Sequence, residues 1–176
     1  KIGDFTVRED VPLPVLGSGN KSLAADDITP DNIILGMLEV LKNDPVNDNL
    51  SYYRDFIYTV KPSIDEMLTS AALEAENNMD FNDAIDIYKG LLALNNDSKD
   101  HILNIAVCYD EFSQFLYSKG KENEAFKMED LAAKYFKILE NNSDKNDRVY
   151  YYLGRFYLIR ENYDKAVDFL RDFIKL

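Results

Sequence analysis

The strongest constraint on the fold is a recurring spacing of large and small apolar residues. Leu68 begins the pattern Leu-x-x-Ala-Ala-x-x-Ala, and Ala84 follows sixteen residues later. Tyr150 begins Tyr-x-x-Leu-Gly-x-x-Tyr, and Ala166 again follows after sixteen residues. Residues three and four positions apart share one face of a helix. The spacing therefore predicts pairs of helices that approach each other closely at small side chains.

Helical periodicity continues through the whole chain from Thr29 onward. Thr29–Pro30 is typical of a helix start, and Ser98 is a second candidate cap. No sustained alternation of apolar and polar residues predicts a strand. We expect eight helices in four antiparallel pairs, at about 30–43, 50–60, 63–77, 81–94, 99–118, 121–141, 147–161 and 163–175.

Residues 1–28 differ from the rest and are expected to form an extended or irregular arm. Pro12 and Pro14 keep the residues before them out of the helical conformation. The apolar side chains of Leu13, Val15 and Leu16 can hold this arm against the helical domain, which we assign to residues 29–176.

The repeated pattern resembles the tetratricopeptide repeat (TPR) family, whose units are helix pairs with a period of 34 residues. The corresponding units here are about 31–64, which is divergent, then 65–98, 99–146 and 147–176. In the third unit Ile102 and Ala132 are 30 residues apart instead of 16, an insertion of 14 residues that lengthens both helices. The resemblance implies an all-α, right-handed solenoid of about four TPR-like units, preceded by the arm.

Composition argues against several classes of function. The net charge of -12, from 20 basic and 32 acidic residues, is unfavourable for general nucleic-acid binding. One Cys and one His cannot form a Cys/His zinc site, and we expect no metal, no cofactor and no catalytic residues. No window of 18 apolar residues suggests a span of the membrane. Cys108 lies in an apolar run and is expected to be buried.

The resemblance implies a non-catalytic scaffold that binds a peptide or a partner protein in a concave groove lined by the first helix of each unit. Arg148, Tyr151, Tyr152 and Arg155 fall on one stripe of the helix 147–161. Arg and Tyr are enriched at binding hot spots. The predicted groove residues are Arg148, Tyr151, Tyr152, Arg155, Asn104 and Asp100. An alternative is that the arginines pair within the chain, with Asp100 or Glu66.

Two further surfaces are candidates for contacts with another molecule. Phe169, Phe173 and Ile174 on the last helix can form a homo-oligomer face, which would make the chain a self-assembling structural module. Phe112, Phe115 and Leu116 on the inserted segment either form a protruding knob or close the long helix pair. A third function is that of an accessory domain of a larger protein.

The sequence does not fix the compartment. Because the chain opens on Lys1, we expect a fragment, a soluble domain of the cytoplasm or, where an N-terminal anchor has been removed, of the cell envelope.

Overall fold

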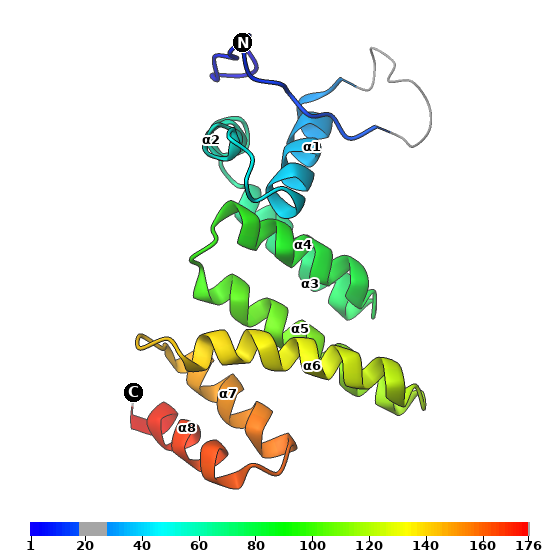
Figure 1. The fold of residues 1–176 in the computed structure, drawn as a ribbon, viewed down its shortest axis with the longest axis vertical. Helices are drawn as coiled ribbons and strands as arrows, with labels where there is room; N and C mark the ends of the chain where they lie inside the picture. Colours follow the sequence, from blue (N-terminus) through cyan, green and yellow to red (C-terminus); the bar gives the residue numbers. More distant parts are fainter. Residues whose placement is uncertain (18–27, 176) are drawn as a thin grey trace. The chain divides into compact units, whose positions relative to one another are not determined.

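The computed structural model describes residues 1–17 and 28–175, and within these ranges the fold is all-α (Figure 1). The only extended pairing in the described ranges is an isolated bridge between Ile2 and Phe5. The predicted all-α class is therefore confirmed. The eight helices of the described residues are α1 (Pro30–Asn43), α2 (Leu50–Val60), α3 (Ile64–Asn77), α4 (Phe81–Leu94), α5 (Lys99–Ser118), α6 (Glu122–Glu140), α7 (Asp147–Ile159) and α8 (Tyr163–Lys175).

The chain divides into two compact units. Unit 1 comprises Lys1–Glu74 and Asp86–Asp97, and unit 2 comprises Ala75–Ile85 and Ser98–Leu176. Helices α3 and α4 each contribute residues to both units. Each unit has its own interior and is described separately.

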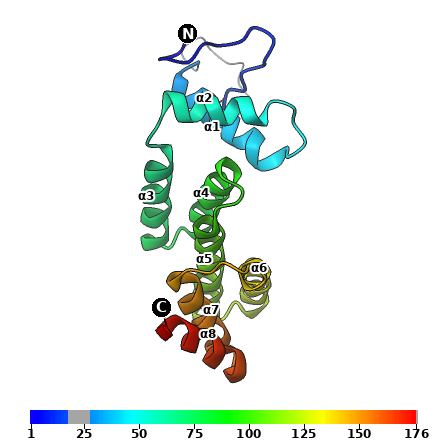
Figure 2. The ribbon, with the colours of Figure 1, turned by 90° about the vertical axis from the view of Figure 1, so that its left-hand side faces the viewer.

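In unit 1 the N-terminal segment 1–17 packs along α1 and α2 (Figure 2). The Phe5 ring meets the ring of Phe56 edge to face, with 5.0 Å between centroids. The Tyr53 hydroxyl donates a hydrogen bond of 3.0 Å to the carbonyl oxygen of Pro12, and Val11 is buried. The arm is thus part of the core of unit 1. The remainder of the predicted arm, residues 18–27, lies outside the described residues.

A glycine in α1 permits the close approach of the arm. A Cβ atom built on Gly36 would lie 2.5 Å from the carbonyl oxygen of Pro14 and 2.8 Å from the amide nitrogen of Val15. Both contacts are with backbone atoms, which cannot rotate away. Of the side chains predicted to hold the arm, Leu13 and Val15 are half-buried, whereas Leu16 is exposed and is fixed through its amide, which donates to the carbonyl oxygen of Asn32 at 2.9 Å.

Local signals explain where several helices begin. The Thr29 side chain accepts a hydrogen bond from the amide of Asn32 at the start of α1, and the Ser98 side chain accepts one from the amide of His101 at the start of α5. These side chains satisfy amides that have no partner within the helix. Asn146 plays the same role for α7 by accepting from the amide of Val149.

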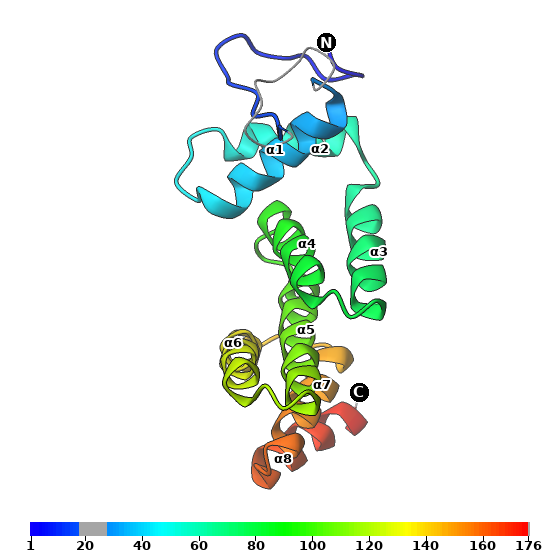
Figure 3. The same ribbon diagram turned by 90° about the vertical axis from the view of Figure 1, so that its right-hand side faces the viewer.

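Unit 2 contains two antiparallel helix pairs, α5 with α6 and α7 with α8 (Figure 3). The α5 and α6 helices have 20 and 19 residues, against 13 each for α7 and α8. The small residues at the predicted contact positions, Ala106, Ala132 and Ala166, are fully buried. A Cβ atom on Gly154 would lie 2.6 Å from Cγ of Leu170. Small side chains therefore set the distance between the paired helices.

The aromatic residues of the long helix pair turn inward within unit 2. The Phe81 ring stacks on Phe112 with 5.0 Å between centroids and lies 5.5 Å from the ring of Phe115. Leu116 and Ala125 are buried. The three residues named as a candidate knob thus pack against their own unit, while Phe126, near the start of α6, is exposed.

Candidate functional site

The predicted groove residues lie on α5 and α7 of unit 2, and three of them meet directly. The Arg148 guanidinium donates to Asp100 Oδ1 through Nη1 and to Asn104 Oδ1 through Nη2, each at 3.2 Å. The Arg148 side chain is 51% exposed and that of Asp100 is 55% exposed. One arginine of the stripe is therefore paired within the chain, through Asp100, on an open surface.

The two tyrosines extend this surface toward α8. The rings of Tyr151 and Tyr152 meet edge to face at 5.2 Å between centroids, and Tyr151 also lies 5.7 Å from the ring of Phe173. Tyr151 is exposed, and Tyr152 is half-buried. Phe173, expected on an oligomer face, thus contributes to the aromatic surface beside the arginines.

Arg155 stands at the other end of the stripe and is half-buried. Among the described residues, no carboxylate forms an ion pair with it within 4.0 Å. The positive charge of Arg155 nevertheless interacts electrostatically with the carboxyl group of Glu111 in α5. Burial raises the pKa of Glu111, the neighbouring Glu76 carboxylate raises it further, and Arg155 counteracts both. The stripe therefore presents a guanidinium beside a carboxylate that is costly to ionise.

Glu111 was not among the predicted groove residues. It follows Asp100, Asn104 and Val107 at the spacing of one helix face, and this spacing could have identified it. The acidic side of the surface thus extends along α5 from Asp100 to Glu111.

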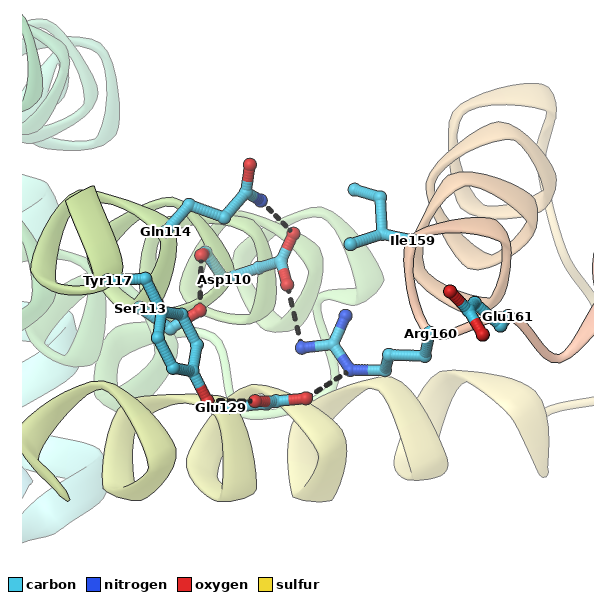
Figure 4. Close-up of a pocket in the computed structure, with 8 residues that line it drawn as sticks. All are labelled: Asp110, Ser113, Gln114, Tyr117, Glu129, Ile159, Arg160 and Glu161. Atoms are coloured by element: carbon cyan, nitrogen blue, oxygen red, sulfur yellow. Dashed lines mark hydrogen bonds and ion pairs between the residues drawn. The ribbon is translucent and has the colours of Figure 1, made fainter. Parts of the chain in front are cut away.

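A second feature of unit 2 is a hollow of about 470 Å³ beside the long helix pair (Figure 4). Arg160, directly after α7, places its guanidinium between two carboxylates, 3.0 Å from Asp110 Oδ1 of α5 and 3.0 Å from Glu129 Oε1 of α6. The other oxygen of Asp110 accepts from the Gln114 amide at 2.9 Å, and the Tyr117 hydroxyl donates to Glu129. The Asp110 side chain is only 8% exposed.

We name the contacts of Arg160 with Asp110 and Glu129 the Arg160 network. These contacts compensate the negative charge of the buried Asp110 carboxylate. The guanidinium carbon also lies 3.7 Å from the centroid of the Phe156 ring. Because an unpaired buried carboxylate is strongly destabilising, this arrangement joins α5 and α6 to the end of α7. Because the polar groups of the Arg160 network bind one another, we assign the network a structural role.

A neighbouring hollow of about 600 Å³ contains a second ion-pair cluster at its edge. Glu140 accepts from Lys165 Nζ at 2.6 Å, from the Tyr157 hydroxyl at 2.9 Å and from Lys137 Nζ at 2.9 Å. Partial burial raises the pKa of Glu140, but these hydrogen bonds outweigh burial and lower the pKa to about 2. The carboxylate is thus held ionised and links the end of α6 to α7 and α8.

The residues of the proposed oligomer face separate in the structure. Phe169 stacks on Tyr157 with an interplanar angle of 7°, inside the α7/α8 pair. Phe173 lies near Tyr151, and Ile174 alone of the three is largely exposed, at 81%.

The remaining candidates for chemistry lie inside helices. Cys108 is fully buried, and burial raises the pKa of its thiol, the Glu76 carboxylate adding to the effect. In the described ranges no three His, Cys, Asp or Glu side chains are grouped as metal ligands. No helix in those ranges is both long and apolar enough to cross a bilayer. Comparisons with models of known families, with curated proteins and with solved structures find no significant match to this chain.

Proposed function

We propose that this protein is a non-catalytic, TPR-like interaction scaffold that binds a peptide segment of a partner protein on the surface formed by α5 and α7. The resemblance of the sequence supports the repeat assignment. The burial of Ala106, Ala132 and Ala166 and the close approach at Gly154 agree with the packing that such repeats need. The proposal concerns unit 2, where paired helices carry the repeat pattern.

The observation that carries the binding proposal is the Arg/Tyr stripe of α7 facing the acidic side of α5. Arg155 has no ion-pair partner among the described residues. Arg148 has one, but a half-exposed pair contributes only about 0.2–1 kcal/mol. A carboxylate of a bound peptide can therefore replace Asp100 at Arg148, or bind Arg155 directly, at small cost.

The same surface defines the chemistry of the partner. A guanidinium binds a carboxylate in a bidentate manner, and the exposed Tyr151 ring offers apolar area next to it. A fitting ligand is an extended or helical peptide with an acidic side chain and a neighbouring apolar one. Asp100 and Glu111 disfavour a strongly acidic peptide and limit the number of carboxylates that the surface accepts.

The test is a selection of peptides from a display library on the immobilised protein, followed by affinity measurements with variants. Arg155→Ala and Tyr152→Ala should each weaken the selected peptides by about 1–3 kcal/mol, or roughly 5–150-fold, without loss of helical signal. Arg8→Ala is a matched control, because Arg8 is exposed and belongs to unit 1.

Two results would contradict the proposal. The first is that selected peptides bind both variants as tightly as the unchanged protein. The second is that both variants lose their helical signal, which would assign these side chains to the scaffold instead.

A further inference from the structure

The outer face of α8 carries an apolar stripe that its own unit does not cover. Tyr163, Val167 and Ile174 are 59%, 51% and 81% exposed. Together with the half-buried Leu170 they follow one another at intervals of four, three and four residues. This is the spacing of the contact seam of a two-helix coiled coil. We name Tyr163, Val167, Leu170 and Ile174 the α8 stripe.

The α8 stripe is distinct from the face that attaches α8 to its unit. Attachment is provided by the fully buried Ala166, by Phe169 stacked on Tyr157, and by the contact of Phe173 with Tyr151. Only Leu170 takes part in both faces, since it lies against Gly154. Covering the stripe therefore requires no rearrangement of unit 2.

Charges along one flank of the stripe identify what can cover it. Asp164, Asp168, Arg171 and Lys175 lie on the same side of the stripe when the residues are placed at 3.6 per turn. All four are exposed. The first half of this flank is acidic and the second half is basic. The contact of Arg171 with Asp168 within the helix is a surface pair, 3.4 Å long, and is easily exchanged.

This order of charges is complementary to itself in one arrangement. When two copies of the helix pack antiparallel, the same flank of each faces the other, so that acidic residues of one copy oppose basic residues of the second. In a parallel arrangement this flank would face the opposite flank, which contains the buried Ala166 and the exposed ring of Phe173 and offers no charges. The pattern therefore selects a two-fold, antiparallel contact.

We propose that α8 is a self-association surface, on which a second copy of this chain docks antiparallel through the α8 stripe. Asp164 of each copy faces Arg171 of the second copy, at the edge of an apolar seam formed by Val167 and Leu170. The α8 stripe shares no residue with the predicted groove, so that dimer formation and peptide binding can be tested with different variants.

The dimer is expected to be weak. A helix of 13 residues is about 20 Å long, and a single helix pair lies at the low end of the areas found in specific interfaces. We expect a dissociation constant of about 10 μM to about 1 mM.

Sedimentation velocity over a concentration series tests the proposal. The unchanged protein should shift from monomer to dimer across this range. Val167→Asp should raise the dissociation constant about tenfold or more, because it places a charge in the seam. Ile138→Asp is the matched control: Ile138 lies on α6 and is 52% exposed, close to the 51% of Val167, and its change should leave the dimer intact.

A charge exchange tests the orientation. Asp164→Arg and Arg171→Asp should each weaken the dimer, and the double variant should restore it, since the complementary order is re-established with its signs reversed. Circular dichroism verifies that each variant keeps its helices. The proposal is wrong if the protein stays monomeric throughout, if Val167→Asp dimerises normally, if Ile138→Asp dissociates the dimer equally, or if the double variant does not recover.

Discussion

The close approach of α7 and α8 at Gly154 gives a prediction whose sign depends on a single neighbouring side chain. In Gly154→Ala the new methyl group would lie 2.6 Å from Cγ and 2.7 Å from Cδ2 of Leu170, well inside normal contact distance. The backbone nitrogen of Leu170, at 3.4 Å, limits how far the methyl group can move in compensation. Either Leu170 changes rotamer or α8 shifts outward.

Two opposing contributions determine the magnitude. Replacing Gly by Ala inside a helix stabilises the folded state by about 0.5–1 kcal/mol through helix propensity. Overpacking of an occupied contact costs about 1–3 kcal/mol. We therefore expect Gly154→Ala to lower the free energy of unfolding by about 0.5–2 kcal/mol, or the melting temperature by a few degrees, since about 1 kcal/mol corresponds to about 2–4 °C in a protein of 176 residues.

The decisive experiment repeats the change after removal of the obstacle. In a Leu170→Ala background the methyl group has room, so that Gly154→Ala should instead stabilise the protein by about 0.5–1 kcal/mol. Gly90→Ala is the control for propensity alone: Gly90 lies in α4, and no atom is within 4 Å of its built Cβ. It should raise the stability of unit 1.

Thermal and urea unfolding, followed by circular dichroism, measure the unchanged protein and the four variants Gly154→Ala, Leu170→Ala, the double variant and Gly90→Ala. If Gly154→Ala stabilises the unchanged background as much as it stabilises the Leu170→Ala background, the close approach of the two helices does not exist. The explanation of why a small residue occupies position 154 would then be wrong as well.

Two further predictions concern an ion pair and the arm. The pKa of Glu140, lowered from 4.5 to about 2, stabilises the fold above about pH 4.5 and ceases to do so as the pH falls through about 2. Glu140→Gln, which weakens the contact with Lys165, should therefore cost about 1–2 kcal/mol at pH 7 and little at pH 2, as urea unfolding at both pH values will show. Gly36→Ala should displace the arm, because its methyl group meets the backbone of Pro14. Faster cleavage by trypsin after Arg8 would report the displacement, and unchanged protection would contradict it.

Helix limits follow from local sequence, and they were largely predictable. Thr29 and Ser98 were expected as caps and act as such. The end of α7 was placed at residue 161, but the helix ends at Ile159. Glu161 adopts a left-handed conformation, with φ of 57°. Gly or Asn is the usual residue for this conformation at the end of a helix, so the sequence did not predict it at Glu161.

The packing of the arm was predictable only in outline. Its prolines correctly indicated an irregular segment, and Leu13 and Val15 are half-buried as expected. The Phe5 ring was missed, although it contacts Tyr52 and Phe56. A segment without periodicity gives no rule for which side chains face the core, because the partners are about 50 residues away and are set by the tertiary fold.

The Arg160 network shows why the ionic contacts of unit 2 could not be derived from the sequence. The periodicity of α5 indicates one of its members, Asp110, but nothing in the sequence indicates Arg160. Asp110 shares a helix face with the buried residues Leu103, Ala106 and Ser113, so that periodicity places a carboxylate where an apolar side chain is expected. A buried carboxylate requires a cation or several donors, so a partner is implied. The sequence does not say which cation it is, because Arg160 is 50 residues away and stands in a turn after α7, where exposed arginines are common.

The pairing of the predicted groove residues could not be derived from the sequence either. The spacing within α7 placed Arg148 and Arg155 on one stripe, but spacing alone left open which of them would be paired within the chain. That choice depends on the offset between α5 and α7, which places Asp100 and Asn104 within 3.2 Å of Arg148. Residues on one helix are therefore predictable as a set, whereas the pairing between two helices depends on their packing. For this reason Arg155, rather than Arg148, is the more informative position at which to test peptide binding.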